Sequence, residues 1–299
     1  VSRPVVPEKN AIVPDRYREL RLAFEGGWGL RVRAYDDGVA YRFTTSFADS
    51  LVIAAEEATF RFAGSHTTVF GADPARWMSH QEPGYERIPL DDLEPGAKGL
   101  TPMVLEVGDD GPRLVVMESA LESYPGMHLV AAGDRTLAGA FPPRALGDDI
   151  DDIRNVGVTG RAEHIARTEG TRRFPWRILA IAGDDAALIE NQIVYRLAPE
   201  LRIDDPFWIE PGKVAWDWWN DWNIHGVEFR AGINQATYEH YIDYAAEYGL
   251  RYIILDEGWS PLDDLLSMRN DIDVPALVDY GRQREVGIIL WAVWKPIDL

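Results

Sequence analysis

The stretch that decides the fold is residues 212–259, GKVAWDWWNDWNIHGVEFRAGINQATYEHYIDYAAEYGLRYIILDEGW. An apolar run at 214–219 predicts a buried strand, and a second run at 252–256 predicts another. Between them Asn234 is placed to cap a helix, and Gly249 stands where a C-terminal cap belongs. The apolar positions of this predicted helix recur at spacings of three and four: Tyr238, Tyr241, Ile242, Ala245 and Tyr248.

The same pattern repeats once more toward the end of the chain. Asp273 and Pro275 open a second predicted helix, and 287–291 is a third apolar run. Leu277, Val278 and Gly281 lie on one side of that helix. The strands start near 214, 252 and 286, which is 38 and 34 residues apart. Parallel β/α units of about 30 residues are typical of an eight-unit barrel. We therefore predict that residues 209–299 are the first three units of a (β/α)8 TIM barrel.

The first two-thirds of the chain, residues 1–208, reads as β structure. Apolar residues alternate with polar ones, and turns of Gly and Asp type separate the runs at Gly26-Gly27 and Asp36-Asp37-Gly38. We predict no long helix before about residue 230. The expected strands lie near 20–24, 30–34, 39–43, 58–62, 103–107, 114–118 and 176–181. Many short strands joined by regular turns predict a β-sandwich or a large double sheet.

Composition and charge exclude several classes of protein. The net charge is -19, so the phosphates of a nucleic acid would be repelled. No apolar run reaches the roughly 18 residues that a membrane span needs. The chain has no cysteine, which excludes disulfides and thiolate chemistry. It opens on Val1 without an initiator Met or a signal peptide, and it closes on Leu299 just after an apolar run, so we expect a fragment.

Polar and aromatic side chains gather where the predicted barrel strands end. In a (β/α)8 barrel the active site lies at the carboxyl ends of the strands. The residues predicted to bind substrate there are Asp217, Asp256, Glu257, Trp259, Trp291 and Trp294. Carboxylates accept hydrogen bonds from sugar hydroxyls, and indole rings stack on the apolar face of a pyranose. This combination suits a carbohydrate ligand.

Each of these residues also has a purely structural interpretation. A tryptophan in a strand is more often core than ligand platform, and Asp217 could equally be a structural hydrogen-bonding group. Asp256 and Glu257 are adjacent and point to opposite sides, so at least one of the two is expected to face the barrel mouth. The chain has no glycine-rich phosphate loop, no HExxH motif and no GxSxG elbow, and its six histidines have no metal-ligand spacing.

Residues 212–259 closely resemble the start of the catalytic barrel of glycoside hydrolase family 97. Upstream motifs resemble the same family: AYDDGVAYRF at 34–43, ESYPGM at 122–127 and PWR at 175–177. The resemblance implies a β-super-sandwich, a (β/α)8 barrel and a C-terminal sheet, acting on α-linked glucosides or galactosides. It also implies that the first sandwich strands, the last five barrel units and the C-terminal sheet are missing from this chain.

The resemblance assigns roles to two residues. Glu82, in the segment WMSHQE at 77–82, matches a carboxylate that the sandwich lends to a calcium ion in the active site, and oxygen donors suit calcium. Glu257 matches a carboxylate that binds hydroxyls of the sugar ring. The catalytic nucleophile and the acid/base are expected beyond Leu299, so this fragment is expected to be inactive. The secreted full-length enzyme is expected in the periplasm or outside the cell.

The end of the third predicted strand distinguishes two branches of the family. The inverting branch carries a general-base Glu there, whereas this chain has no carboxylate between Leu290 and Asp298. This pattern resembles the retaining branch, which implies an α-galactosidase acting on an oligosaccharide or α-glycoside. The alternatives are an α-glucosidase of the same family and a non-catalytic carbohydrate-binding fragment. The sequence fixes neither the aglycone nor the oligomeric state.

Overall fold

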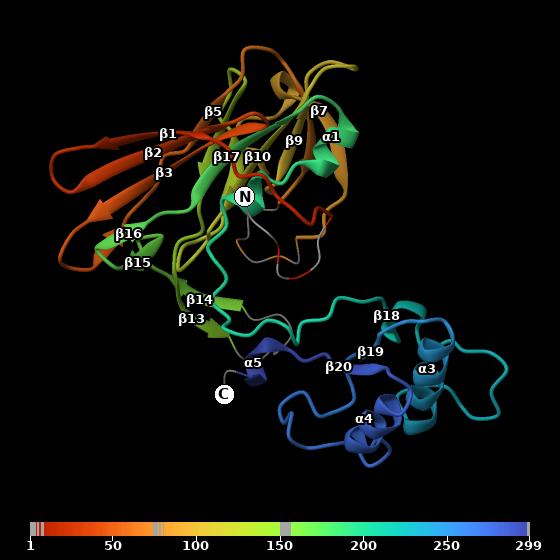
Figure 1. Cartoon of the computed structure of the whole chain (residues 1–299). Helices are drawn as coiled ribbons and strands as arrows, with labels where there is room; N and C mark the ends of the chain where they lie inside the picture. The colour runs from red at the N-terminus through yellow and green to blue at the C-terminus, as the bar shows by residue number, and fades with distance from the viewer. Residues whose placement is uncertain are drawn as a thin grey trace. The chain divides into compact units, whose positions relative to one another are not determined.

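The computed structural model describes residues 4, 6, 9–73, 77, 79, 81–149 and 157–297 of the chain (Figure 1). The chain divides into two compact units. One comprises Val1–Asp148 and Val158–Pro206, and the other comprises Asp149–Gly157 and Phe207–Leu299. Strands dominate the first unit, and the second alternates strands with helices.

The first unit contains a large antiparallel sheet in the order β1-β2-β3-β17-β10-β9-β6-β7, with β16 paired to β3. Its strands are β1 (Arg18–Ala23), β2 (Trp28–Tyr35), β3 (Gly38–Ser46), β6 (Thr67–Gly71), β7 (Tyr85–Pro89), β9 (Met103–Glu106), β10 (Arg113–Ser119), β16 (Thr171–Arg173) and β17 (Trp176–Ala182). A second sheet has the order β5-β12-β11-β8, formed by β5 (Thr59–Arg61), β12 (Thr136–Ala140), β11 (His128–Ala131) and β8 (Lys98–Gly99). Two short pairs join β4 (Leu51–Ile53) to β15 (Ala166–Thr168) and β13 (Ala145–Asp149) to β14 (Gly157–Arg161).

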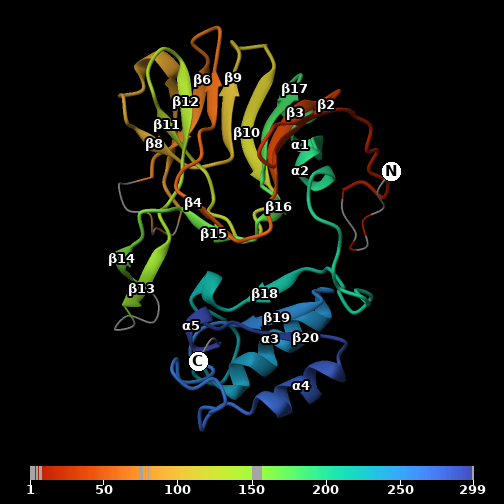
Figure 2. The ribbon, with the colours of Figure 1, turned by 90° about the vertical axis from the view of Figure 1, so that its left-hand side faces the viewer.

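The two larger sheets pack face to face and enclose one core, as in a β-sandwich (Figure 2). The large sheet contributes Met103 and Leu105, and the smaller sheet contributes Leu129 and Leu137, all fully buried. The period of two residues along each strand sends every second side chain into this core. The predicted β-rich first part of the chain is therefore confirmed.

Helices cover the opposite face of the large sheet. α1 (Asp185–Glu190) and α2 (Ile193–Arg196) follow β17, and Ile193 and Leu197 pack with Trp176 and Ile178 of that strand. Gly38 lies beneath this layer, where a Cβ would come within 2.7 Å of Ile193 Cδ1. The predicted turn at 36–38 therefore also needs a glycine for close packing.

A buried ion cluster ties together several of the motifs quoted above. The guanidinium of Arg177 binds Glu56 through two hydrogen bonds of 2.6 and 2.8 Å and also binds Glu118. Glu118 in turn accepts a hydrogen bond of 2.7 Å from the amide of Met127. Burial raises the pKa of Glu118 even though Arg177 opposes the shift. The motifs at 122–127 and 175–177 thus meet in one charged cluster inside the sandwich.

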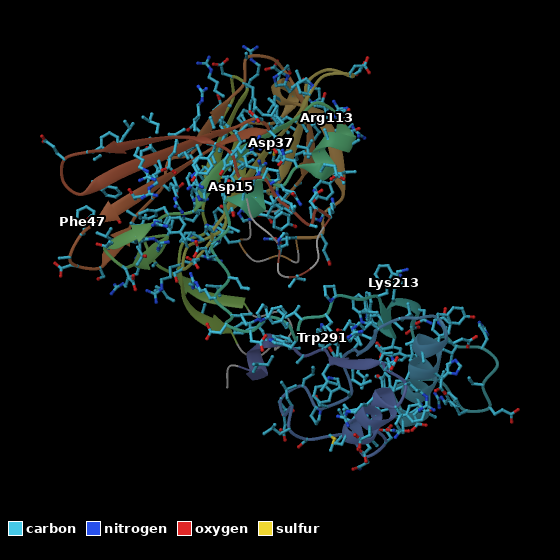
Figure 3. The ribbon with its side chains drawn as sticks, viewed as in Figure 1. Asp15, Asp37, Phe47, Arg113, Lys213 and Trp291 are labelled. Atoms are coloured by element: carbon cyan, nitrogen blue, oxygen red, sulfur yellow. The ribbon has the colours of Figure 1, made fainter. Side chains whose placement is uncertain are left out.

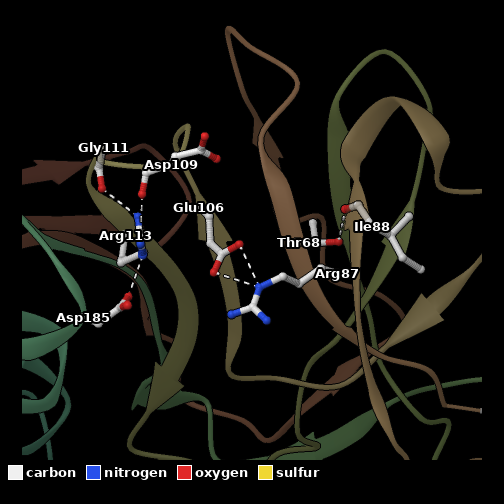
Figure 4. A network of polar contacts seen from close by, with 8 residues as sticks. All are labelled: Thr68, Arg87, Ile88, Glu106, Asp109, Gly111, Arg113 and Asp185. Atoms are coloured by element: carbon white, nitrogen blue, oxygen red, sulfur yellow. Dashed lines mark hydrogen bonds and ion pairs between the residues drawn. The ribbon is translucent and has the colours of Figure 1, made fainter.

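More exposed polar contacts link the strands of the large sheet and the helix that follows β17 (Figure 4). Arg113 on β10 binds Asp185 at the start of α1 at 2.6 Å. Arg87 on β7 binds Glu106 on β9 at 3.2 Å. The intervening strand β6 carries Thr68, whose hydroxyl donates to the Ile88 carbonyl at 2.7 Å.

The second unit contains a parallel sheet, β18-β19-β20, with α-helices in the connections. Its elements are β18 (Val214–Trp216), α3 (Gln235–Glu247), β19 (Tyr252–Leu255), α4 (Val274–Arg282), β20 (Gly287–Leu290) and α5 (Trp294–Ile297). The side chains of Asn234 and Asp273 cap α3 and α4 by accepting from the amides of Thr237 and Ala276. Gly249, with φ +66°, ends α3. These predicted helices and their caps are confirmed.

Two details of the predicted elements are wrong. The strand predicted at 214–219 ends at Trp216, because Asp217 accepts from the Trp218 amide and starts a 3-10 turn, Trp218–Asn220. Tyr248 does not join the buried face of α3. It is 61% exposed and stacks on Tyr244, with ring centroids 4.4 Å apart.

Candidate functional site

The three parallel strands of the second unit bring their carboxyl ends to one edge of the sheet. Trp216 lies opposite Ile254, and Leu255 lies opposite Leu290. The residues that follow the strands therefore meet at this edge: Asp217 after β18, Asp256 and Glu257 after β19, and Trp291 after β20. Parallel α/β proteins commonly bind ligands at the carboxyl ends of their strands.

Asp217 is a carboxylate of this edge that accepts hydrogen bonds from four donors. It is 1% exposed. It accepts from the Trp218 amide at 2.7 Å, from Trp222 Nε1 at 3.0 Å, from the Tyr238 hydroxyl at 2.9 Å and from the Asp256 amide at 3.3 Å. Burial raises its pKa, and the bonds from Tyr238 and Trp222 oppose that shift. Because its oxygens already have these partners, Asp217 is suited to hold the ends of β18 and β19 in register.

Asp256 connects the strand ends to the tryptophans. The residue is 6% exposed, and its carboxylate accepts from Trp216 Nε1 at 2.6 Å and from the Glu257 amide at 2.6 Å. Glu257 is half-buried beside it. The structure thus brings the two predicted carboxylates, Asp256 and Glu257, to the edge where Asp217 also lies.

The predicted tryptophans have different environments. Trp259 is 7% exposed in the core of this unit, where its indole donates to the Trp291 carbonyl at 2.7 Å. Trp291, labelled in Figure 3, is 37% exposed, and Trp294 is 56% exposed. The rings of Trp291 and Trp294 are therefore accessible, whereas Trp259 fixes the segment after β20.

A further group of tryptophans at this edge is absent from the sequence-based list of site residues. Trp216, Trp218 and Trp219 pack their rings together with centroids 5.6 to 6.2 Å apart. Trp218 and Trp219 are 54% and 77% exposed. The run WDWW at 216–219 was itself the signal, but it was interpreted as the end of a buried strand at 214–219. The turn at Asp217 instead carries these rings out of the sheet.

The turn that carries these tryptophans has unusual backbone angles and is held by side-chain hydrogen bonds. Asp221 and Trp222 adopt the left-handed region, with φ of 52° and 51°. The Tyr241 hydroxyl of α3 donates to Asn220 Oδ1 at 2.6 Å. Residues other than glycine adopt this region at a cost, so the surrounding bonds must hold the turn in place.

Glu82, the predicted calcium ligand, lies in the first unit and is exposed. Its neighbours Met78 and His80 lie outside the described residues. Ser79 donates to Asp73 at 3.2 Å, and the Gln81 amide donates to the Ser79 hydroxyl at 3.3 Å. Within the residues described, no group of three or more His, Cys, Asp or Glu side chains is arranged to hold a metal ion. Glu82 is therefore one oxygen donor rather than a calcium site, which needs about six to eight oxygens.

Comparison with known proteins identifies the class and then the family. The chain matches the family "Glycosyl-hydrolase 97 N-terminal" over residues 2–199 and the family "Glycoside hydrolase 97" over residues 218–298. These are sugar-cleaving enzymes. The chain belongs to glycoside hydrolase family 97.

Two curated relatives have related names. The chain is 36% identical over 298 residues to a "Retaining alpha-galactosidase" of Bacteroides thetaiotaomicron, an alignment that covers 95% of this chain and 45% of the relative. It is 28% identical to a "Probable retaining alpha-galactosidase" of Streptomyces bingchenggensis, covering 99% of this chain and 44% of the relative. The chain therefore spans less than half the length of these relatives.

Solved structures share the fold of this chain. A family 97 enzyme from Pseudoalteromonas sp. strain K8, in complex with acarbose, superposes with a TM-score of 0.68 at 22% identity, covering 91% of this chain and 44% of that one. A β-arabinopyranosidase superposes with a TM-score of 0.67 at 22% identity, covering 91% of this chain and 42% of that one. Among the described residues, no helix has the length and apolar character needed to cross a bilayer.

Proposed function

We propose that this chain supplies the sandwich and the first three units of a (β/α)8 barrel to a retaining α-galactosidase. The observation that carries the proposal is the 36% identity to a retaining α-galactosidase along 95% of the chain. The parallel order β18-β19-β20, with α3 and α4 in the connections, is the arrangement from which such a barrel is built. The proposed substrate is an oligosaccharide or another α-linked glycoside.

The strand-end residues are proposed to hold the sugar. Asp256 and Glu257 would accept hydrogen bonds from ring hydroxyls, and the exposed rings of Trp291 and Trp294 would wall the subsite. The hydrogen bond from Trp216 Nε1 orients the Asp256 carboxylate for this purpose. Asp217 and Trp259 are proposed to contribute by positioning, since both are buried and fully engaged with neighbours.

The bond-breaking groups are proposed to lie outside this chain. Retaining hydrolysis uses a nucleophile and an acid/base about 5–5.5 Å apart, and family likeness assigns both to residues beyond Leu299. Glu82 is proposed to lend one oxygen to a calcium ion whose other ligands also lie outside the chain. Bound calcium would supply positive charge near the reacting bond.

The proposal is tested by comparing two aryl glycosides. The protein of the complete reading frame is assayed on p-nitrophenyl α-galactoside and p-nitrophenyl α-glucoside, beside the chain 1–299. We expect the complete protein to prefer the galactoside in kcat/KM and the chain alone to turn over neither. A preference for the glucoside would assign an α-glucosidase. Turnover by the chain alone that is lost on mutating its residues would contradict the placement of the catalytic groups.

The calcium role of Glu82 has its own test. Calorimetric titration of calcium into the complete protein is compared for the wild type and Glu82→Gln. We expect weaker binding in the variant, because one charged oxygen ligand becomes neutral. Asp91→Asn, an exposed carboxylate of the same unit, is the control and should bind calcium as the wild type does. Equal affinity in wild type and Glu82→Gln would remove Glu82 from the site.

A further inference from the structure

A cavity of about 1030 Å³ lies on the sandwich unit, beside Trp176 and the chain segment that follows α2. Its charged lining consists of five arginines and three carboxylates: Arg33, Arg42, Arg173, Arg196, Arg202, Asp15, Glu122 and Glu200. Asp15, labelled in Figure 3, has one buried carboxylate oxygen without a hydrogen-bond partner among the described residues. Glu19 and Asp37, which are not part of this lining, bind Arg33 and Arg196, so five guanidinium groups and five carboxylates gather around the cavity. What could bind an anionic ligand here is therefore a guanidinium donor left without an acceptor, not an excess of positive charge.

Three of the five arginines have carboxylate partners. Arg33 binds Glu19 at 2.7 Å, Arg196 binds Asp37, and Arg202 binds Glu122. For Arg42 and Arg173, no carboxylate oxygen lies within 4.0 Å among the residues that the structure describes. These two arginines have no carboxylate in contact with them, although Asp15 and Glu200 line the same cavity.

Arg42 is the more unusual of the two because it is buried. Its residue is 8% exposed, and its Nε is buried without an acceptor among the described residues. The guanidinium lies 4.2 Å from the centre of the Trp176 ring. Its direct cross-strand neighbour on β2 is another arginine, Arg31. Like charges in that relation destabilise a sheet, and a buried unpaired charge costs free energy.

The surroundings of Arg42 disfavour its positive charge. Burial, together with the nearby charges of Arg173, Arg31 and Arg33, lowers its pKa to about 10, although the Glu19 carboxylate opposes the shift. Natural sequences seldom bury a charge beside like charges, and the exceptions are expected at functional or strained sites.

We propose that Arg42 and Arg173 form a binding site for the oxyanion group of a small ligand, such as the carboxylate of an acidic sugar. A guanidinium presents a planar fork of N–H donors that matches carboxylate, sulfate or phosphate oxygens. Small-molecule sites have volumes of roughly 300–1,000 Å³, so this cavity accommodates more than a bare ion. All residues of this cavity lie in the sandwich unit, and none of them is among the residues proposed for the glycosidase site.

Calorimetric titration of the chain tests the site. Sodium glucuronate, sulfate and phosphate are titrated separately at constant ionic strength, with glucose as the neutral control. We expect at least one oxyanion to bind saturably and glucose not to bind. Arg42→Met should weaken that binding at least about tenfold, the loss expected for one charged hydrogen bond. Tighter binding of glucuronate than of sulfate would identify the sugar acid, and the reverse would identify an inorganic oxyanion.

Two controls make the result decisive. Arg87→Gln removes the same charge from an exposed position on β7, outside the cavity lining, and should bind as the wild type does. Without ligand, Arg42→Met should unfold at no lower urea concentration than the wild type, because it keeps the apolar stem and removes an unpaired charge. If Arg42→Met does not fold, exposed Arg173→Gln should show the loss of affinity instead. No saturable binding, or equal losses in Arg87→Gln, would overturn the proposal.

Discussion

Asp217 occupies the point where β18 gives way to the tryptophan turn, and four donors converge on its carboxylate. In Asp217→Asn an amide nitrogen in place of Oδ2 cannot accept from the Trp222 indole, and one in place of Oδ1 cannot accept from the Trp218 amide. We expect the free energy of unfolding to fall by about 1–3 kcal/mol, the cost of buried donors without acceptors. Urea unfolding followed by tryptophan fluorescence measures this fall in the free energy of unfolding.

The matched control for Asp217→Asn is Asp221→Asn. This residue lies in the same turn but is exposed, and asparagine tolerates its left-handed backbone. The control should unfold close to the wild type. Equal destabilisation by the two substitutions would show that the carboxylate of Asp217 has no special structural role.

Arg177 is the centre of the ion cluster inside the sandwich. Arg177→Met removes the only guanidinium that binds both Glu56 and Glu118 among the described residues, and it leaves two carboxylates buried. Breaking a buried pair in this way costs about 3–5 kcal/mol. We therefore expect a large fall in unfolding free energy by urea denaturation. Asp185→Asn, which breaks the more exposed Arg113 pair, should have a far smaller effect. Similar effects of the two variants would contradict the importance of the buried cluster.

His128 gives the sandwich a predictable response to pH. Burial lowers its pKa, with Lys98 acting in the same direction and Asp73 opposing it. The unfolded chain therefore takes up a proton at higher pH than the folded chain does. Stability is fully present above about pH 6.5 and falls as the pH drops from there toward the lowered pKa.

The test compares urea unfolding at pH 7.5 and pH 5.5. We expect His128→Gln to lose less stability between these two pH values than the wild type. His66→Gln, in the same unit, is the control, because His66 forms no ion pair among the described residues. An unchanged pH dependence in His128→Gln would show that His128 does not couple protonation to folding.

At the scale of elements, α3 ends through the backbone conformation of a single residue. Gly249 has φ +66°, and the next amide, of Leu250, donates back to the Ala245 carbonyl at 2.8 Å. A Cβ at position 249 would meet no atom within 4 Å, so a substitution there probes conformation alone. Gly249→Ala should lower the free energy of unfolding by about 1 kcal/mol.

Asparagine provides the comparison for Gly249→Ala, because it adopts the left-handed region more readily than alanine. We expect Gly249→Asn to be closer to the wild type in urea unfolding. The opposite order would mean that the helix end does not depend on the left-handed conformation.

At the scale of the whole molecule, the residues that follow β20 predict whether hydrolysis retains or inverts the configuration of the sugar. An inverting enzyme needs a base about 6.5–9.5 Å from its acid, with room for a water between them. The residues that follow β20 before the end of the described chain are Trp291, Ala292, Val293 and those of α5 (Trp294–Ile297), none of which is acidic. Under the proposed function, the nucleophile then attacks directly from another strand and the configuration is retained.

Proton NMR of the complete protein acting on p-nitrophenyl α-galactoside measures this outcome. We expect α-galactose to appear first, before mutarotation produces the β-anomer. The same reaction run with Glu82→Gln serves as a control, because a slower enzyme should still give the same anomer. First appearance of β-galactose would assign the inverting mechanism and contradict the proposal.

The sequence by itself determined most of the elements and their caps. Period-two alternation predicted β1, β2 and β3, and Asn234 and Gly249 marked the limits of α3. These signals are local, because a cap or a tight turn is formed by residues that are neighbours in the chain. The quoted family motifs likewise predicted family 97, to which the chain belongs.

Tertiary structure alone decided which side chains are buried, paired or left exposed. Apolar sequence predicted a buried strand through Trp219, but the bonds from Trp222 and Tyr238 to Asp217 turn the chain after Trp216. The carboxylates that bind Arg177, of Glu56 and Glu118, lie 121 and 59 residues away in the chain. The register of the sheet places Arg31, another cation, opposite Arg42. Such pairings join residues that are distant in the chain, so their energies depend on the completed packing, which local sequence patterns do not encode.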